Sequence, residues 1–332
     1  MKKMTIFPAD RVAVLCDATT ARLCYPLLRD SLPEHALITV SEGDDHKDMD
    51  TLAQVWRAMQ DNGMTRHSWL VNLGGGMVTD LGGFAAATYK RGIRFTNVPT
   101  TLLAMVDAAT GGKTGVNFNG LKNEVGAFRE ADEVVIDTDF LKTLDDRNLR
   151  SGFAEMLKHA LLKDEKFLAE HLKFNLAEVD YEKLQGLVGE SVEVKKDVVA
   201  QDPHEKGLRK ALNLGHTVGH AIESLYLERE HPLLHGYAVA WGLVAELFLS
   251  SAHCQFPTQT LRQVVSFINE YFGRPEISCN DYDKLLQLMR HDKKNCGDAI
   301  NFTLLANVGE IRLDQNVSLE MIREALDFLR EG

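Results

Sequence analysis

The stretch WLVNLGGGMVTDLGGFAAATYKRGIRFTNVPTTLLAMVDAATGGKTGVNFNGLK, residues 69–122, decides the fold that this sequence predicts. Its first part, 68–73, is a short apolar run typical of a buried parallel strand, and glycines follow at 74–76. The next run, 77–89, has helical spacing and small residues. A strand, a glycine turn and a helix allow backbone N–H groups to approach a pyrophosphate. The order is not G-x-G-x-x-G, so a tight turn or close packing explains the glycines equally well.

The second part of the stretch adds residues suited to anions. A proline and two threonines, 99–101, end a strand at 94–98 and begin a helix with threonine caps. Asp107 lies near the end of that helix, and Lys113 and Lys122 follow on glycine-rich turns. Lysines on such turns are usually solvated. Beside a nucleotide-binding turn, two of them would instead hold a substrate phosphate.

Composition places the chain among ordinary globular proteins. Its 332 residues suggest about two domains, and a hydrophobic content of 45% is enough for a sizeable core. The net charge of −11 disfavours nucleic acid or an acidic membrane as a partner. The basic residues discussed below therefore act locally.

The cysteines and the N-terminus indicate a cytoplasmic protein. Five cysteines are scattered without a C-x-x-C pair, which argues against a disulfide framework and a cysteine zinc site. The apolar run near the N-terminus is too short for a signal peptide. No stretch approaches the roughly 20 apolar residues that a membrane span needs.

Short strands alternate with helices through the first part of the chain. Strands are predicted at 11–17, 36–40, 68–73, 94–98 and 133–137, and helices at about 19–31, 47–59 and 77–89. This alternation predicts a parallel sheet with right-handed crossovers, a Rossmann-like α/β domain over residues 1–144.

Helical periodicity dominates the remaining residues. It covers most of 147–249, returns at 281–290 and 318–330, and is interrupted by a strand pair at 301–305 and 310–313. Residues 145–332 are therefore predicted to form a mainly α-helical domain. The cleft between the two domains, outside the carboxyl ends of the strands, is the expected site.

The helical half carries a candidate metal site. His216 and His220 are spaced i and i+4 on one helix face, and His235 follows beyond a proline. Glu155 lies in a helix of small residues. A catalytic zinc takes three protein ligands and keeps one open position, which a glutamate and two or three histidines would provide. Packed or hydrogen-bonded core histidines are the alternative.

Basic residues gather in the same half of the chain. On helices such residues usually form solvated faces, and the nearby Glu205 would then be a surface partner. The basic residues are Lys158, Lys195, Lys196, Arg209 and Lys210.

Taken together, these segments resemble the 3-dehydroquinate synthase family. The matching motifs are GGGMVTDLGGFAAATYKRG, VPTTLLAMVDAATGGKTGVN, LKNEVGAF, GFAEMLKHALL, ALNLGHTVGHAIE, HGYAVAWG and DKKN, and they run in family order from about residue 17 to 295. The resemblance implies an N-terminal Rossmann-like domain that binds NAD and a helical C-terminal domain that carries zinc. It also implies conversion of 3-deoxy-D-arabino-heptulosonate 7-phosphate, a sugar phosphate, to 3-dehydroquinate and phosphate.

The resemblance further implies roles for individual residues. The metal ligands would be Glu155, His216 and His235, holding zinc or, as an alternative, cobalt. Contacts to NAD would come from Asp17, Asp44, Lys47, Gly75, Gly76, Asp80, Thr100, Thr101, Lys122 and Thr143. The catalytic residues would be Asp107, Lys113, Lys158, Glu205, Asn213 and His220. The substrate-binding residues would be Arg91, Asn123, Lys195, Arg209 and Lys293. In this family the residue at the position of Arg91 reaches into the neighbouring subunit's site, which implies a homodimer.

The chain departs from the family pattern at a few positions. Tyr237 stands after the ligand histidine and its glycine, where the family usually has glutamate, and Asn148 stands where an acidic residue is usual. Thr79 precedes Asp80 in place of the usual glycine, and Thr19 stands in place of a common asparagine. These departures concern the surroundings of the zinc and the adenosine contacts, and no implied ligand is lost.

The implied chemistry needs the groups that the residues suggest. NAD would take a hydride from carbon 5 and return it after phosphate elimination, and zinc would polarise the reacting oxygens. Lysines and Arg209 would hold a substrate that carries phosphate and carboxylate. A cyclase for another sugar phosphate would not need the carboxylate clamp of Lys195 and Arg209. A glycerol dehydrogenase-like alcohol dehydrogenase would have no use for the phosphate-binding lysines, and a catalytically dead binding protein would not keep every ligand.

Overall fold

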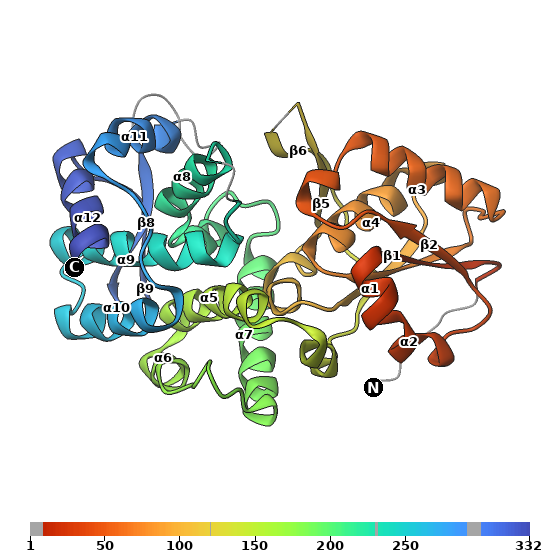
Figure 1. Cartoon of the computed structure of the whole chain (residues 1–332), viewed down its shortest axis with the longest axis horizontal. Helices are drawn as coiled ribbons and strands as arrows, with labels where there is room; N and C mark the ends of the chain where they lie inside the picture. The colour runs from red at the N-terminus through yellow and green to blue at the C-terminus, as the bar shows by residue number, and fades with distance from the viewer. Residues whose placement is uncertain (1–8, 120, 230–231, 291–299) are drawn as a thin grey trace. The chain divides into compact units, whose positions relative to one another are not determined.

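The computed structural model describes residues 9–119, 121–229, 232–290 and 300–332. Lys293 and the DKKN motif lie outside the described residues. The chain divides into two compact units, Met1–Leu149 and Arg150–Gly332 (Figure 1). The prediction of a parallel-sheet α/β domain followed by a mainly helical domain is confirmed.

The first unit is built on a parallel sheet of five strands in the order β2-β1-β3-β4-β7. These strands are β1 (Val12–Asp17), β2 (Ala36–Val40), β3 (Trp69–Gly74), β4 (Arg94–Pro99) and β7 (Glu133–Val134). Its helices are α1 (Ala18–Leu23), α2 (Tyr25–Leu28), α3 (Met49–Asp61) and α4 (Gly76–Thr88). Along the chain, β1 is followed by β2 on one side of it in the sheet, whereas β3 is followed by β4 on the opposite side. The point between the carboxyl ends of β1 and β3 is therefore the switch point at which such sheets bind ligands.

Helices α3 and α4 pack against each other and against the sheet. Their apolar residues, including Leu52, Val55 and Leu81, join the buried faces of β1 and β3 in one core. Glycines allow α4 to lie close: a Cβ on Gly82 would meet Asn72 Oδ1 of β3 at 2.0 Å. The small residues of this helix therefore lie at contacts with its neighbours. Because most of the helix is buried, its sequence shows only a weak alternation of apolar and polar faces.

The structure corrects two predictions for the first unit. The glycine-rich segment that carries Lys113 and Lys122 forms an antiparallel hairpin of β5 (Lys113–Phe118) and β6 (Leu121–Phe128), so both lysines lie on strands. Most of β6 is exposed, and its pattern lacks the apolar alternation that marks a half-buried strand. The predicted helix at 19–31 is broken after Leu23, and its N-cap is Asp17, which accepts from Thr20 N at 2.7 Å, in place of a threonine.

The second unit is mainly helical. Its helices are α5 (Asp146–Lys163), which begins just before the unit boundary, α6 (Glu165–Leu172), α7 (Tyr181–Gln201), α8 (His216–Leu227), α9 (His235–Cys254), α10 (Thr258–Phe272), α11 (Tyr282–Arg290) and α12 (Leu319–Glu331). The predicted strand pair is present as β8 (Asn301–Asn307) and β9 (Glu310–Asn316). Among the described residues, no helix is long and apolar enough to span a bilayer.

Helix α9 is the central element of this unit. It contacts α8, α10, α12 and β8 (Figure 1), and most of its residues are buried. It packs very close to α8 because the contact positions are glycines. A Cβ on Gly242 would lie 1.9 Å from Gly215 O, and a Cβ on Gly219 would lie 2.9 Å from Ala238 O. The start of α8 is therefore held directly against the body of α9.

We expect Gly242→Ala to destabilise the protein by about 1–3 kcal/mol, because the added methyl group forces α8 and α9 apart. The measurement is denaturant unfolding. The matched control is Gly186→Ala in α7, where a Cβ meets nothing within 4 Å; an alanine in this exposed helical position should be neutral or stabilising. Equal stability of the two variants would contradict the close contact between the helices.

We expect His171 to make the second unit sensitive to acid. Its ring is fully buried against aromatic side chains, and this burial lowers its pKa to about 4. Between that value and the ordinary value of about 6.5, the unfolded chain binds a proton that the folded chain does not, so stability falls as pH falls. As the pH falls from 7 to 4.5, the unfolding free energy of wild type should decrease by about 2–3 kcal/mol more than that of His171→Phe. Parallel pH profiles for the two proteins would exclude this role.

Candidate active site

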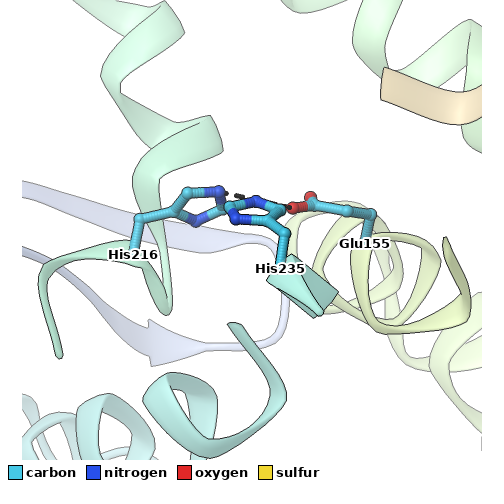
Figure 2. Close-up of side chains that lie close together, drawn as sticks. All are labelled: Glu155, His216 and His235. Atoms are coloured by element: carbon cyan, nitrogen blue, oxygen red, sulfur yellow. Dashed lines mark ion pairs between the residues drawn. The ribbon is translucent and has the colours of Figure 1, made fainter. Parts of the chain in front are cut away.

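A fully buried carboxylate lies at the centre of a polar group in the second unit. Glu155 of α5 has no exposed surface, and Figure 2 shows it pointing at the rings of His216 and His235. Its Oε1 lies 3.3 Å from Nε2 of each ring, and its Oε2 forms an ion pair with Lys158. The two histidines are the first residues of α8 and α9. Three helices thus each contribute one side chain that could bind a metal ion.

The spacing of these donors fits a zinc ion. Ligand atoms about 2.0–2.2 Å from a tetrahedral zinc lie about 3.3–3.5 Å from one another. The two measured separations from Glu155 Oε1 are 3.3 Å, and the three donor atoms all lie within 4.8 Å of one another. Within the described residues, neither oxygen of Glu155 accepts a well-formed hydrogen bond. One carboxylate and two imidazoles are the donor set of a catalytic zinc site with an open position.

The protonation of this group follows from burial and from neighbouring charges. Burial opposes ionisation of Glu155, but the ammonium of Lys158 holds its pKa well below the usual range. Burial lowers the pKa of His216 to about 3, so its ring is neutral, as a metal ligand must be. Burial also opposes charge on His235, yet Glu223 and Glu155 raise its pKa to about 10. A metal at its Nε2 would take the place of that proton.

A second buried carboxylate, Glu246 of α9, holds the turn that presents His216. Its Oε2 accepts from Gly215 N at 2.6 Å, and its Oε1 accepts from Val218 N at 3.0 Å. No side chain of α8 caps these amides, so Glu246 satisfies them and complements the helix dipole. The His216 ring donates from Nδ1 to Leu214 O at 3.0 Å, because a carbonyl can only accept. Its Nε2 therefore faces the central carboxylate.

A third carboxylate contacts His235, the other histidine of this group. Nδ1 of His235 lies 3.1 Å from Glu223 Oε2, and His220, Glu223 and His235 form a second group of donor atoms within 4.8 Å of one another. The His220 ring centre is 5.2 Å from that of His216. The sequence analysis missed Glu223 and Glu246. The available signal for Glu223 was its position in H-x-x-x-H-x-x-E, on the same helix face as both histidines of α8.

Three of the predicted basic residues are buried, contrary to the solvated-face alternative. Lys158, Lys195 of α7 and Arg209 are 1%, 6% and 3% exposed. The other two, Lys196 and Lys210, form ion pairs with acidic side chains nearer the surface. In a chain of net negative charge, a buried cation of this kind suits a local contact with an anionic group.

The loop that carries Arg209 is organised by Asp202, which the sequence analysis missed. Its carboxylate accepts from the backbone N–H groups of Lys206 at 3.0 Å, Gly207 at 2.7 Å and Arg209 at 3.0 Å. These bonds lower the pKa of Asp202 and hold the loop. In the same loop, Asn213 Nδ2 donates to Glu205 Oε1 at 3.0 Å, so Glu205 is a partner of Asn213 within this loop.

The first unit brings together four of the predicted NAD contacts. Lys47, which is 4% exposed, lies 3.2 Å from both Asp44 Oδ1 and Asp80 Oδ2. Lys122 of β6 lies 3.3 Å from the other oxygen of Asp44. Asn117 fixes this arrangement: its Nδ2 donates to Asp44 O at 2.8 Å and its N donates to Lys47 O at 2.7 Å. Sequence patterns did not single out Asn117, because its partners are distant in the chain.

Other predicted NAD contacts lie at the carboxyl ends of the strands. Asp17 ends β1, Gly75 and Gly76 follow β3, and Thr100 and Thr101 follow β4. Helix α4 begins at Gly76 without a side-chain cap, so its first amides are available to a phosphate. Gly75 has φ −74°, and its Cβ would meet Thr101 Cγ2 at 3.0 Å, so this glycine serves close packing and not an unusual backbone angle.

The remaining predicted residues of this unit are more dispersed. Thr143 Oγ1 lies 3.5 Å from Cys24 Sγ, and Asp107 is half-buried in the π-helix Ala104–Ala108 that follows β4. Lys113 and Asn123 are exposed on the hairpin. Arg91 is exposed at the end of the 3-10 helix Tyr89–Arg91, which precedes the amino end of β4.

Comparisons with known proteins agree over both units. A family model described as 3-dehydroquinate synthase N-terminal matches residues 37–151, and one described as 3-dehydroquinate synthase C-terminal matches residues 152–295. A 3-dehydroquinate synthase of Parabacteroides distasonis is 52% identical over 325 residues, which cover 97% of this chain and 92% of that protein.

Solved structures that share this fold include sugar phosphate cyclases. A 2-epi-5-epi-valiolone synthase of Streptomyces hygroscopicus, with NAD⁺ and Zn²⁺ bound, has a TM-score of 0.82 at 27% identity and covers 96% of this chain and 90% of its own. A 2-deoxy-scyllo-inosose synthase has a TM-score of 0.83 at 24% identity, covering 98% and 91%, a likeness of fold. The family models and the high identity over nearly the whole length establish that this chain belongs to the 3-dehydroquinate synthase family.

Proposed function

We propose that this protein is a 3-dehydroquinate synthase, a lyase that converts 3-deoxy-D-arabino-heptulosonate 7-phosphate to 3-dehydroquinate and phosphate. The observation that carries the proposal is the approach of His216 and His235 to the buried carboxylate of Glu155, with Lys158 against it, in a chain 52% identical to a relative of that name. A metal site beside buried cations is what a reaction on an anionic polyol requires. The product lies on the route to chorismate and the aromatic amino acids.

The proposed cofactors are NAD and zinc. The donor set of the second unit fits zinc, cobalt being the alternative, and the carboxyl edge of the first unit's sheet, with the uncapped start of α4, fits a dinucleotide. When bound, the metal supplies Lewis-acid polarisation of substrate oxygens and NAD supplies a reversible hydride acceptor.

The chain's own residues would bind and orient the substrate. Lys195 and Arg209, both buried, would hold the substrate carboxylate, and Arg209 is already oriented by its bond to Pro203 O at 2.7 Å. Asn213 donates from Nδ2 to Glu205, which leaves its Oδ1 to accept from a substrate hydroxyl. Lys158 keeps its ammonium beside Glu155, where it would favour charge on a nearby substrate oxygen.

The phosphate would be held by residues of the first unit. Lys113, Lys122 and Asn123 all lie on the β5–β6 hairpin, and Asp107 lies shortly before it. Lys293 is assigned to the substrate by the family pattern alone. Tyr237, where the family usually has glutamate, packs its ring against Phe272, so the second unit accommodates this departure in an aromatic contact.

A homodimer is also part of the proposal. Arg91 is exposed at the amino end of β4, whereas Gly75 and Thr101 lie at the carboxyl ends of the strands. A residue in that position has no evident use within its own unit's site, which supports the family pattern in which it serves the neighbouring subunit. The cytoplasmic location, inferred from the cysteines and the sequence near the N-terminus, stays a prediction.

Two alternative enzyme activities are compatible with the same two-unit fold. A cyclase for a substrate without a carboxylate would keep the metal group but would have no use for the buried pair Lys195 and Arg209. A glycerol dehydrogenase-like alcohol dehydrogenase would not need residues that bind a substrate phosphate. Turnover of candidate sugar phosphates by the purified protein distinguishes all three.

We expect His235→Ala to lose most of its zinc, because one of three protein ligands is removed. Metal content after dialysis is the measurement. The matched control is His253→Ala, which removes an exposed histidine near the end of the same helix and should leave zinc unchanged. Full zinc occupancy in His235→Ala would remove this histidine from the ligand set.

We expect Arg209→Ala to lower kcat/KM by roughly 10- to 100-fold, since one charge-assisted contact to the substrate carboxylate is lost. Steady-state kinetics on the heptulosonate phosphate give the value. The neighbouring Lys210→Ala is the control, because that ammonium pairs with Asp314 at 2.9 Å. An Arg209→Ala enzyme with unchanged kcat/KM would exclude the clamp.

We expect NAD⁺ to be required but not consumed, because the hydride leaves carbon 5 and returns to it. A trace of NAD⁺, far below the substrate concentration, should support complete conversion with phosphate release, and deuterium at carbon 5 should remain in the product. Stoichiometric NADH without phosphate release would identify an ordinary alcohol dehydrogenase. Loss of the deuterium would show that the cofactor exchanges during the cycle.

A further inference from the structure

Both ring nitrogens of His235 face carboxylates. Nε2 lies 3.3 Å from Glu155 Oε1, and Nδ1 lies 3.1 Å from Glu223 Oε2. A carboxylate only accepts, so Nδ1 donates its hydrogen to Glu223 and the ring is held with Nε2 directed at Glu155 and His216. A metal-binding histidine oriented in this way by an outer carboxylate is a recurrent arrangement in zinc sites.

The position of Glu223 suits it to this task. It lies on α8, two turns after His216, and only 7% of its surface is exposed. His235 is the first residue of α9, and the preceding Leu234 provides no side-chain cap. Backbone structure at the start of α9 therefore does not fix the ring, whereas Glu223 reaches it from the facing helix.

The two ligand histidines differ in the partner that orients them. Nδ1 of His216 donates to the neutral carbonyl of Leu214 at 3.0 Å, whereas Nδ1 of His235 donates to a carboxylate. Glu223 adds a buried negative charge to that of Glu155 beside His235, opposed by Lys158. A second carboxylate lowers the cost of burying a divalent cation. Its negative charge compensates for the screening by water that the cation loses on burial.

We propose that Glu223 is the positioning residue of the metal site: its carboxylate accepts the Nδ1 hydrogen of His235, holds Nε2 in the ligand direction and adds charge that favours a divalent cation. This inference rests on the proposed metal site of Glu155, His216 and His235. It assigns no contact between Glu223 and the substrate.

The experiment measures zinc affinity of the metal-stripped full-length protein by competition with a chelator. Glu223→Ala removes the acceptor and the charge and should weaken zinc binding by about 10- to 100-fold. Glu223→Gln keeps an acceptor oxygen but loses the charge, and it should weaken binding by a smaller factor, about 3- to 10-fold on the same scale. The control is Glu228→Gln at the C-cap of the same helix, where the carboxylate pairs with Lys284 at 2.8 Å; the zinc affinity of this variant should equal that of wild type.

Thermal unfolding separates this role from a general structural one. The metal-free Glu223→Gln protein should melt within a degree or two of metal-free wild type, while the rise in melting temperature on adding zinc should be smaller in the variant. Equal zinc affinity in Glu223→Ala and wild type would overturn the proposal. So would a Glu223→Gln protein that loses stability without zinc but binds zinc normally. Where Glu223→Ala fails to fold, Glu223→Gln carries the test.

Two further results would overturn the proposal in distinguishable ways. Zinc binding that survives His216→Ala but not His220→Ala would make Glu223 a direct ligand, in the group of His220, Glu223 and His235. A wild-type protein that binds no zinc would remove the proposed metal site itself. If wild type binds zinc and turns over the substrate but the Glu223 variants bind equally well, only the present inference fails.

Discussion

The second unit depends on the burial of one carboxylate. Glu155 has no exposed surface, so its ionised form is tolerable only because cationic or metal-binding groups surround it. Lys158 faces one oxygen, and the rings of His216 and His235 face the other. Three helices must therefore arrive at one point, and the requirement for local neutrality explains why polar residues occupy the interior of an otherwise apolar bundle.

The contact between α8 and α9 fixes the positions of the two histidines relative to each other. Their backbones approach at Gly215, Gly219 and Gly242, where any side chain would collide. Carboxylates then cross the contact in both directions: Glu246 of α9 holds the first turn of α8, and Glu223 of α8 holds the first residue of α9. Each helix thus positions the histidine that begins the other, so the spacing of the donors is a property of the pair.

The first unit uses different means to prepare a binding edge. Parallel pairing places Asp17, Gly74 and Pro99 at one end of neighbouring strands, and α4 begins there without a side-chain cap. Asn117 of the hairpin ties the loop of Asp44 and Lys47 to β5. Backbone geometry and a few polar bonds, rather than charge burial, fix the groups at this edge of the sheet.

The motifs along the chain identify the family, and local patterns in the sequence predict the order of the elements and most of the strands and helices. These are local properties: apolar strands, helical spacing and turn residues report on neighbours within a few positions. It also identified Glu155, His216 and His235 as residues of one site through their resemblance to a family. What remained undecided from local patterns was the β5–β6 hairpin, whose exposed strands lack alternation, and the capping role of Asp17 at a helix that breaks early.

The acidic residues that support the site can be recognised only once the elements are packed together. Glu223 and Glu246 read as ordinary helix positions, and Asp202 as an ordinary loop residue, until α8, α9 and the loop before Asn213 are packed together. Hydrogen bonds between residues far apart in the chain leave no periodic trace in the sequence, because their partners are set by the packing of whole elements.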